Sequence, residues 1–148
     1  MSEENALIEA VDLVKHFPIT GGVLGRQIAK VHAVNGVNFS LHKGDCVGLV
    51  GESGCGKSTL GKTLVRLLDP TAGKIFFSGT DITTLNYREL RPLKRRMQMI
   101  FQDPYGSLNP RMTIENILGE ALLFHKMVSK DQVSKRIDEL LELAGLSK

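Results

Sequence analysis

Apolar residues follow two different periods along this chain of 148 residues. In the first half they alternate or run in short blocks, which predicts strands over residues 7–17, 30–41 and 74–77. Residues 46–50 form an unbroken apolar run, Cys-Val-Gly-Leu-Val, typical of a strand covered on both faces. Pro18 is expected to end the first strand, because proline donates no ladder hydrogen bond. The first half is therefore mostly β.

Helical spacing begins after this apolar run. Residues 57–68 place four leucines on one stripe and predict a helix closed by Asp69-Pro70. Residues 87–96 also favour a helix despite an internal proline, and 97–101 are again strand-like. The glycine-containing stretch 19–27 has almost no periodicity, which indicates an exposed loop.

The last third of the chain is predicted to be helical. One helix is expected over residues 113–126. Residues 129–132, Ser-Lys-Asp-Gln, predict a capping box before a second helix, and Gly145 is its natural C-terminal cap.

Composition narrows the class of protein. Hydrophobic residues at 42% and charged residues at 24% are ordinary for a globular domain, and no apolar run is long enough to cross a bilayer. A net charge of +3 is too small to predict nucleic-acid binding, and the run Lys94-Arg95-Arg96 is interpreted as solvated surface. The polar start does not resemble a signal peptide, so the two cysteines are expected to be reduced cytosolic thiols, and the four histidines show no metal-ligand spacing.

The strongest chemical signal is a phosphate loop. Gly51-Glu52-Ser53-Gly54-Cys55-Gly56-Lys57-Ser58 matches G-x-x-x-x-G-K-[ST] in full, between a predicted strand and a predicted helix. Its glycines allow backbone N–H groups to converge on a phosphate, and the helix adds its positive N-terminal end. Lys57 is expected to reach the β and γ phosphates of a nucleotide, Ser58 to bind Mg²⁺ and Thr59 to contact the α phosphate.

Two cysteines differ in their predicted environments. Cys55 lies inside the phosphate loop, where it is either a tolerated small residue or a thiolate made reactive by the positive surroundings. In the second case a thiol reagent should block nucleotide binding, and ATP should protect Cys55. Cys46, in a predicted buried strand, should be inert.

A second motif narrows the choice among kinases, GTPases, helicases and transport ATPases. Gln102 follows the strand-like stretch 97–101 and enters a polar loop. Its side-chain carbonyl could bind Mg²⁺ or the attacking water while its amide senses the γ phosphate. A lone glutamine is usually surface, but this one follows a complete phosphate loop.

These motifs together resemble the ATP-binding subunits of ABC transporters. The stretch 101–113, Phe-Gln-Asp-Pro-Tyr-Gly-Ser-Leu-Asn-Pro-Arg-Met-Thr, is similar to the subfamily that serves dipeptide, oligopeptide and nickel importers. The resemblance implies an α/β fold of the P-loop NTPase class, with an antiparallel β subdomain, a phosphate-loop βα unit and the start of a helical subdomain around a truncated core. It places residues 1–112 in the nucleotide-binding part and 113–148 in the helical subdomain.

Further roles follow from the resemblance alone. Phe17 occupies the place of the aromatic residue that stacks on adenine, although a core position is the alternative. The segment after Gln102 corresponds to the site where membrane-spanning permease subunits dock, and a second ATP-binding subunit is implied as a partner. No nucleic acid is expected, and the subunit would be peripheral on the cytoplasmic face of the plasma membrane.

Three motifs of the family are absent from the sequence: the Leu-Ser-Gly-Gly-Gln type signature, the Asp-Glu strand and the switch histidine. The chain is therefore expected to bind Mg-ATP without meaningful turnover, and to expose an apolar sheet edge at 46–50 that favours self-association. The alternatives are a stand-alone regulatory module, a small-molecule kinase in which Gln102 is incidental, and a DNA-repair relative whose basic run binds DNA.

Overall fold

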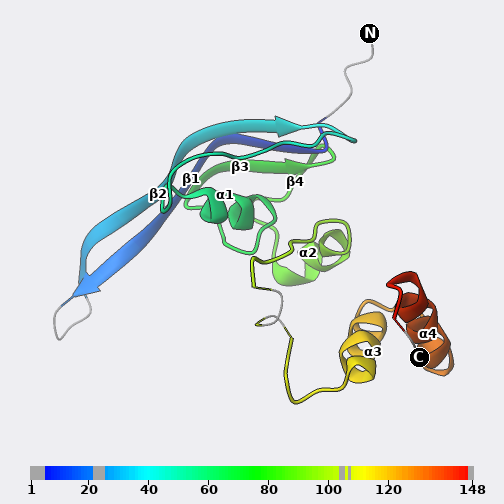
Figure 1. Cartoon of the computed structure of the whole chain (residues 1–148). Coiled ribbons are helices and arrows are strands. Elements are labelled where there is room, and N and C mark those ends of the chain that lie inside the picture. The colour runs from blue at the N-terminus through cyan, green and yellow to red at the C-terminus, as the bar shows by residue number, and fades with distance from the viewer. Residues whose placement is uncertain (1–5, 22–25, 104–105, 107, 147–148) are drawn as a thin grey trace, which may run out of the picture. The chain divides into compact units, whose positions relative to one another are not determined.

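The computed structural model describes residues 6–21, 26–103, 106 and 108–146. The chain forms two compact units, Met1–Met99 and Ile100–Lys148. The first unit contains a four-stranded antiparallel sheet in the order β2-β1-β3-β4 (Figure 1). Its strands are β1 Ile8–Gly21, β2 Arg26–Leu41, β3 Ala72–Phe77 and β4 Thr80–Asp81.

The first two strands are longer than the sequence predicts. β1 continues through Pro18, which pairs with Lys30, so the expected strand end and most of the expected loop 19–27 are wrong; residues 22–25 lie outside the described part. The reason is that β1 pairs with β3 only as far as Val14. Beyond it, β1 has a ladder on one side, and a proline is tolerated where no N–H is needed on the open side.

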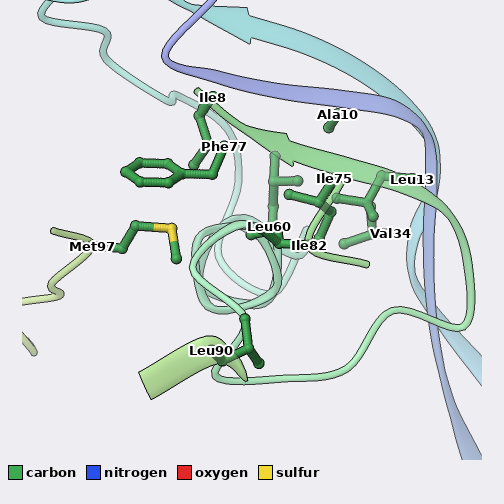
Figure 2. Packing of buried hydrophobic residues seen from close by; sticks show 10 residues of the cluster. All are labelled: Ile8, Ala10, Leu13, Val34, Leu60, Ile75, Phe77, Ile82, Leu90 and Met97. Atoms are coloured by element: carbon green, nitrogen blue, oxygen red, sulfur yellow. The ribbon is translucent and has the colours of Figure 1, made fainter. Parts of the chain in front are cut away.

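One core holds the first unit together between the sheet and two helices (Figure 2). α1 spans Lys57–Leu64 and contributes Leu60, and α2 spans Tyr87–Lys94 and contributes Leu90. α2 begins with a complete capping box, in which Asn86 accepts from the N–H groups of Arg88 and Glu89. The other buried members come mainly from the strands: Ile8, Ala10, Leu13, Val34, Ile75, Phe77, Ile82 and Met97.

Two predicted strands do not form. Residues 46–50 and 97–101 are neither helix nor strand, and no residue of either takes part in the described ladders. Val50 is 93% exposed and Ile100 equally so, which contradicts the prediction of a strand covered on both faces. An apolar segment forms a strand only where a neighbouring strand supplies backbone hydrogen bonds, and the four described strands pair only with one another. We refer to residues 46–50 as the exposed stretch.

The basic run at the end of α2 is only partly a solvated surface. Lys94 Nζ donates to the carbonyl oxygens of Val65 and Arg66 at 2.6 and 2.7 Å. Burial, followed by the nearby charge of Arg66, lowers the pKa of Lys94. Arg96 lies over the Phe77 ring at 4.9 Å. The prediction of a solvated run is therefore wrong for Lys94, whose ammonium group caps the chain that leaves α1.

The second unit contains the predicted helices. α3 spans Ile114–Phe124 with Thr113 as its N-cap, and α4 spans Val133–Leu143. Gly145, at φ 71°, ends α4 with the bond from its N–H to the Glu142 carbonyl, as predicted. The predicted capping box at 129–132 is wrong, because these residues lead into a short 3-10 helix, η2 Lys130–Gln132, and Ser129 makes no side-chain cap bond.

Candidate functional site

The phosphate loop runs directly into the first turn of α1. Gly56 is the N-cap residue and has φ 98°, and Gly54 has φ 83°. Both conformations are in the left-handed region that glycine adopts without a steric penalty. α1 has no acidic side chain in its first turn, so its free N–H groups and dipole leave the loop electropositive.

Lys57 folds back over this loop. Its Nζ donates to the carbonyl oxygens of Gly51 and Glu52 at 2.6 and 2.5 Å and lies 3.5 Å from Cys55 Sγ. The ammonium group thus ties the first turn of α1 to the start of the loop. A polyphosphate in the loop would compete for the same donor, so binding exchanges carbonyl contacts for phosphate contacts.

The side chains that sequence analysis assigned to magnesium and phosphate lie on the same turn. Ser58 and Thr59 are the second and third residues of α1; Ser58 is exposed and Thr59 is half-buried. Ser53 is exposed in the loop itself. The residues fit a phosphate with its Mg²⁺ in chemical type, since they offer backbone N–H groups, one ammonium and one exposed hydroxyl. No group of three metal-ligating side chains occurs within the described ranges.

Close packing fixes the loop against β2. A Cβ at Gly56 would overlap the carbonyl oxygen of Ala33 and lie 3.2 Å from its carbonyl carbon. A cavity of about 300 Å³ opens beside this contact, lined by His32, Asn35, Leu49, Cys55, Lys57 and other residues. Sequence reasoning missed the contribution of β2 to this cavity, because no motif marks His32, Ala33 or Asn35.

Phe17 lies near the same region of the sheet. It pairs with Val31, which is two residues along β2 from Ala33, the residue that contacts the phosphate loop. Lys15 Nζ lies 5.0 Å from the centroid of the Phe17 ring. Phe17 is half-buried and outside the hydrophobic core, so its ring keeps an accessible surface.

The two cysteines are both exposed and free. This placement contradicts the prediction that Cys46 is buried, because the strand expected around it does not form. Cys55 is accessible within the loop. Its reactivity remains a prediction.

Gln102 belongs to the second unit and the phosphate loop to the first. Gln102 is exposed and lies in a stretch without helix or strand. Its role towards a bound nucleotide stays a prediction. No helix of the described part is both long and apolar enough to span a bilayer.

Comparison with known protein families assigns residues 34–148 to the ABC transporter model. The chain belongs to the ABC transporter family. The match includes the phosphate loop and continues through α4, so the resemblance inferred from the motifs is confirmed.

Two curated relatives of this ABC protein are named as ATP-binding proteins of oligopeptide transport and of glutathione import. The chain is 44% identical over 146 residues to the oligopeptide transport ATP-binding protein AppF of Bacillus subtilis, covering 98% of the chain and 44% of AppF. It is 43% identical over 144 residues to the glutathione import ATP-binding protein GsiA of Salmonella typhimurium, covering 97% of the chain and 23% of GsiA. The chain thus spans less than half of the length of these relatives.

Solved ABC structures share the fold. A dimeric, post-hydrolysis structure of the ATP-binding cassette MJ0796 with ADP and Pi aligns with a TM-score of 0.75 at 24% identity, over 95% of this chain and 58% of that one. A second dimeric structure of MJ0796 gives a TM-score of 0.73 at 25% identity, with the same coverage. The α/β fold of the P-loop NTPase class is therefore confirmed.

Proposed function

We propose that this chain is the nucleotide-binding part of an ATP-binding subunit of an ABC importer for peptides or a related small solute. The observation that carries the proposal is the complete phosphate loop at the start of α1, with Lys57 held over it by two carbonyl oxygens. The names of the relatives support peptide-type cargo. In a whole subunit, ATP binding and hydrolysis would drive transport.

Each residue of the loop has a defined task in this proposal. The N–H groups of residues 51–56 surround the phosphates, Lys57 binds the β and γ phosphates, and Thr59 contacts the α phosphate. Ser58 would bind Mg²⁺, which neutralises phosphate charge when bound. By the family resemblance, Gln102 would offer its side-chain carbonyl to Mg²⁺. Phe17, which is half-buried, would stack on adenine through its π system, which provides affinity without a hydrogen-bond code.

Turnover by the 148-residue chain is expected to be negligible. The apolar strand ending in Asp-Glu, whose carboxylates act on water and Mg²⁺ in the family, has no counterpart in this sequence, since Asp138-Glu139 lies within α4, and neither has the signature motif that would act across a dimer. Positioning and electrostatic stabilisation supply nearly all of the catalysis in phosphoryl transfer. We therefore propose that binding and hydrolysis are separable, with only binding retained.

A direct test is titration of a fluorescent ATP analogue in the presence of Mg²⁺. Lys57→Met should weaken binding by about 10- to 100-fold, because it removes a charge-assisted donor to phosphate. Lys135→Met, an exposed lysine on α4, is the matched control and should bind like the wild type. Unchanged affinity of Lys57→Met would refute the phosphate-loop assignment, and phosphate release well above background would refute the separation of binding from hydrolysis.

The proposed contact with permease subunits involves the second unit. A groove of about 450 Å³ is lined by Leu108, Met112, Ile117 and Phe124, among others, and follows Gln102 in the chain. Leu108 is 51% exposed, so a partner could bury it. Leu108→Ser should reduce co-purification with co-expressed permease subunits. Leu143→Ser changes a 79% exposed leucine on α4 that does not line this groove, and it should leave co-purification unchanged. Equal retention of both variants would refute this docking site.

A further inference from the structure

The two longest strands form a ribbon that extends past the rest of the sheet. β1 pairs with β3 only from Ile8 to Val14, whereas its pairing with β2 continues to Gly21 and Arg26. Figure 1 shows this β1–β2 ribbon continuing beyond the ends of β3 and β4. We call its two paired segments, residues 15–21 and 26–34, the ribbon.

Side-chain contacts hold the base of the ribbon in place. The rings of His16 and His32 pair across the strands with centroids 3.9 Å apart. The backbone N–H of His16 also donates to the Thr71 hydroxyl at 3.0 Å, outside the ribbon. The ribbon therefore has a fixed base from which its outer residues are presented to solvent.

Positive charge is concentrated in this hairpin. No acidic residue occurs between Asp12 and Asp45, a span that contains Lys15, Arg26, Lys30 and Lys43 and three of the four histidines. This span therefore carries a formal charge of +4, while the whole chain carries +3 and the remainder thus sums to −1. The net positive charge of the chain thus comes from this span, and the formal charges of the remaining residues nearly cancel.

Exposed aliphatic side chains are interleaved with these cations. Strand alternation places Lys30 on one face, together with the paired His16 and His32, and Ile28 lies at the bulge between the Ile19–Ala29 and Thr20–Gln27 pairs. Phe17, Ile19, Ala29 and Val31 lie on the opposite face. Ile19, Ile28 and Val31 are 42%, 69% and 49% exposed, although aliphatic side chains of this size are usually buried.

We propose that the ribbon binds an anionic lipid surface, with Arg26 and Lys30 contacting headgroups and Ile28, which lies between them in the chain and is 69% exposed, entering the interface. Basic side chains are attracted to anionic lipid headgroups, and apolar side chains next to them gain free energy by leaving water for the membrane interface. Single-stranded nucleic acid is disfavoured because it needs several aromatic platforms, and the ribbon has one aromatic residue, Phe17. An acidic protein surface is the remaining partner that the charge would suit.

Lipid binding by the ribbon would be separate from nucleotide binding and from permease docking. It gives the chain its own contact with the membrane, independent of any protein partner. Lipid vesicles contain neither permease nor nucleotide, so failure of the vesicle experiment would leave the proposed ATP-binding function untouched.

The experiment is co-flotation of the 148-residue chain with vesicles of phosphatidylcholine alone, or mixed with phosphatidylglycerol. The wild type should bind the anionic vesicles, release at high salt and ignore the neutral ones. Arg26→Gln/Lys30→Gln should weaken binding by about 25-fold, since each cation near an anionic surface contributes about five-fold. Lys130→Gln/Lys135→Gln removes the same charge from exposed positions in the second unit and should leave binding within about two-fold of the wild type.

Three results would overturn the proposal. The first is no flotation with anionic vesicles, which would leave an acidic protein as the partner. The second is equal loss of binding in both double variants, which would show an effect of net charge alone. The third is unchanged binding of Ile28→Ser, where entry of the side chain predicts a loss of about five- to ten-fold. All four substituted cations are exposed, and circular dichroism checks that each variant is folded.

Discussion

The contact between the phosphate loop and β2 provides the sharpest test of the site. Gly56→Ala adds a Cβ that must overlap the Ala33 carbonyl oxygen, and it does so at φ 98°, where L residues are strained. The strain alone costs about 1–2 kcal/mol. Overpacking against rigid backbone adds about 1–3 kcal/mol, because neither the loop nor β2 has a flexible side chain to move at this contact.

Two matched glycines separate these contributions. Gly44 has φ 92° and Gly54 has φ 83°, and a Cβ at either would meet nothing within 4 Å. Gly44→Ala measures strain outside the site, and Gly54→Ala measures strain inside the loop. Thermal unfolding should show a decrease of about 2–4 °C per kcal/mol for a chain of this size, with Gly56→Ala the least stable of the three.

Nucleotide binding gives the functional readout. Gly56→Ala can be accommodated only by moving the loop on the order of 1 Å, which is enough to lose about 100-fold where geometry is demanding. Gly44→Ala should bind the ATP analogue like the wild type. Suppose instead that Gly56→Ala unfolds at the same temperature as Gly44→Ala and binds the ATP analogue with wild-type affinity. The loop would then not depend on its packing against β2.

Four further results are expected. Arg66→Met should destabilise the first unit by about 3 kcal/mol in denaturant unfolding, because the buried guanidinium donates to two backbone carbonyls and pairs with a carboxylate, and wild-type stability would contradict this role. Thiol labelling should modify Cys55 and be slowed by saturating Mg-ATP, with unprotected labelling as the contrary outcome. The side-chain hydroxyl and the backbone N–H of Thr83 lower the pKa of Asp81. Their contribution to stability is therefore present above about pH 4 and is lost as the pH falls through the lowered pKa. Thr83→Val should raise the pKa of Asp81 in an NMR titration, and an unchanged pKa would argue against a role of the hydroxyl. The exposed stretch should make the chain self-associate in sedimentation velocity, whereas a monomer at all concentrations would contradict the expectation.

Local chemistry explains what could be predicted from the sequence. The start of α1 directly after the phosphate-loop motif and the glycine that ends α4 depend on residues within a few positions of each other, and the structure places both as expected, whereas the strand expected before the loop does not form. The family assignment follows from the same contiguous motifs. The roles of Phe17 and Gln102 rest on the family resemblance and stay predictions.

Tertiary structure decided the features that depend on distant partners. An apolar run becomes a strand only when another segment supplies its hydrogen bonds, and residues 46–50 have no such neighbour among the described strands. A proline ends a strand only if its missing N–H is needed, and Pro18 lies where β1 has one neighbour. Lys94 reads as a surface cation in sequence, yet two carbonyl oxygens 28 and 29 residues away accept its hydrogen bonds. The identity and spacing of the phosphate-loop motif are local and can be read from the sequence, whereas the contact of Gly56 with β2 and the charged ribbon required the fold, because both bring together residues that are far apart along the chain.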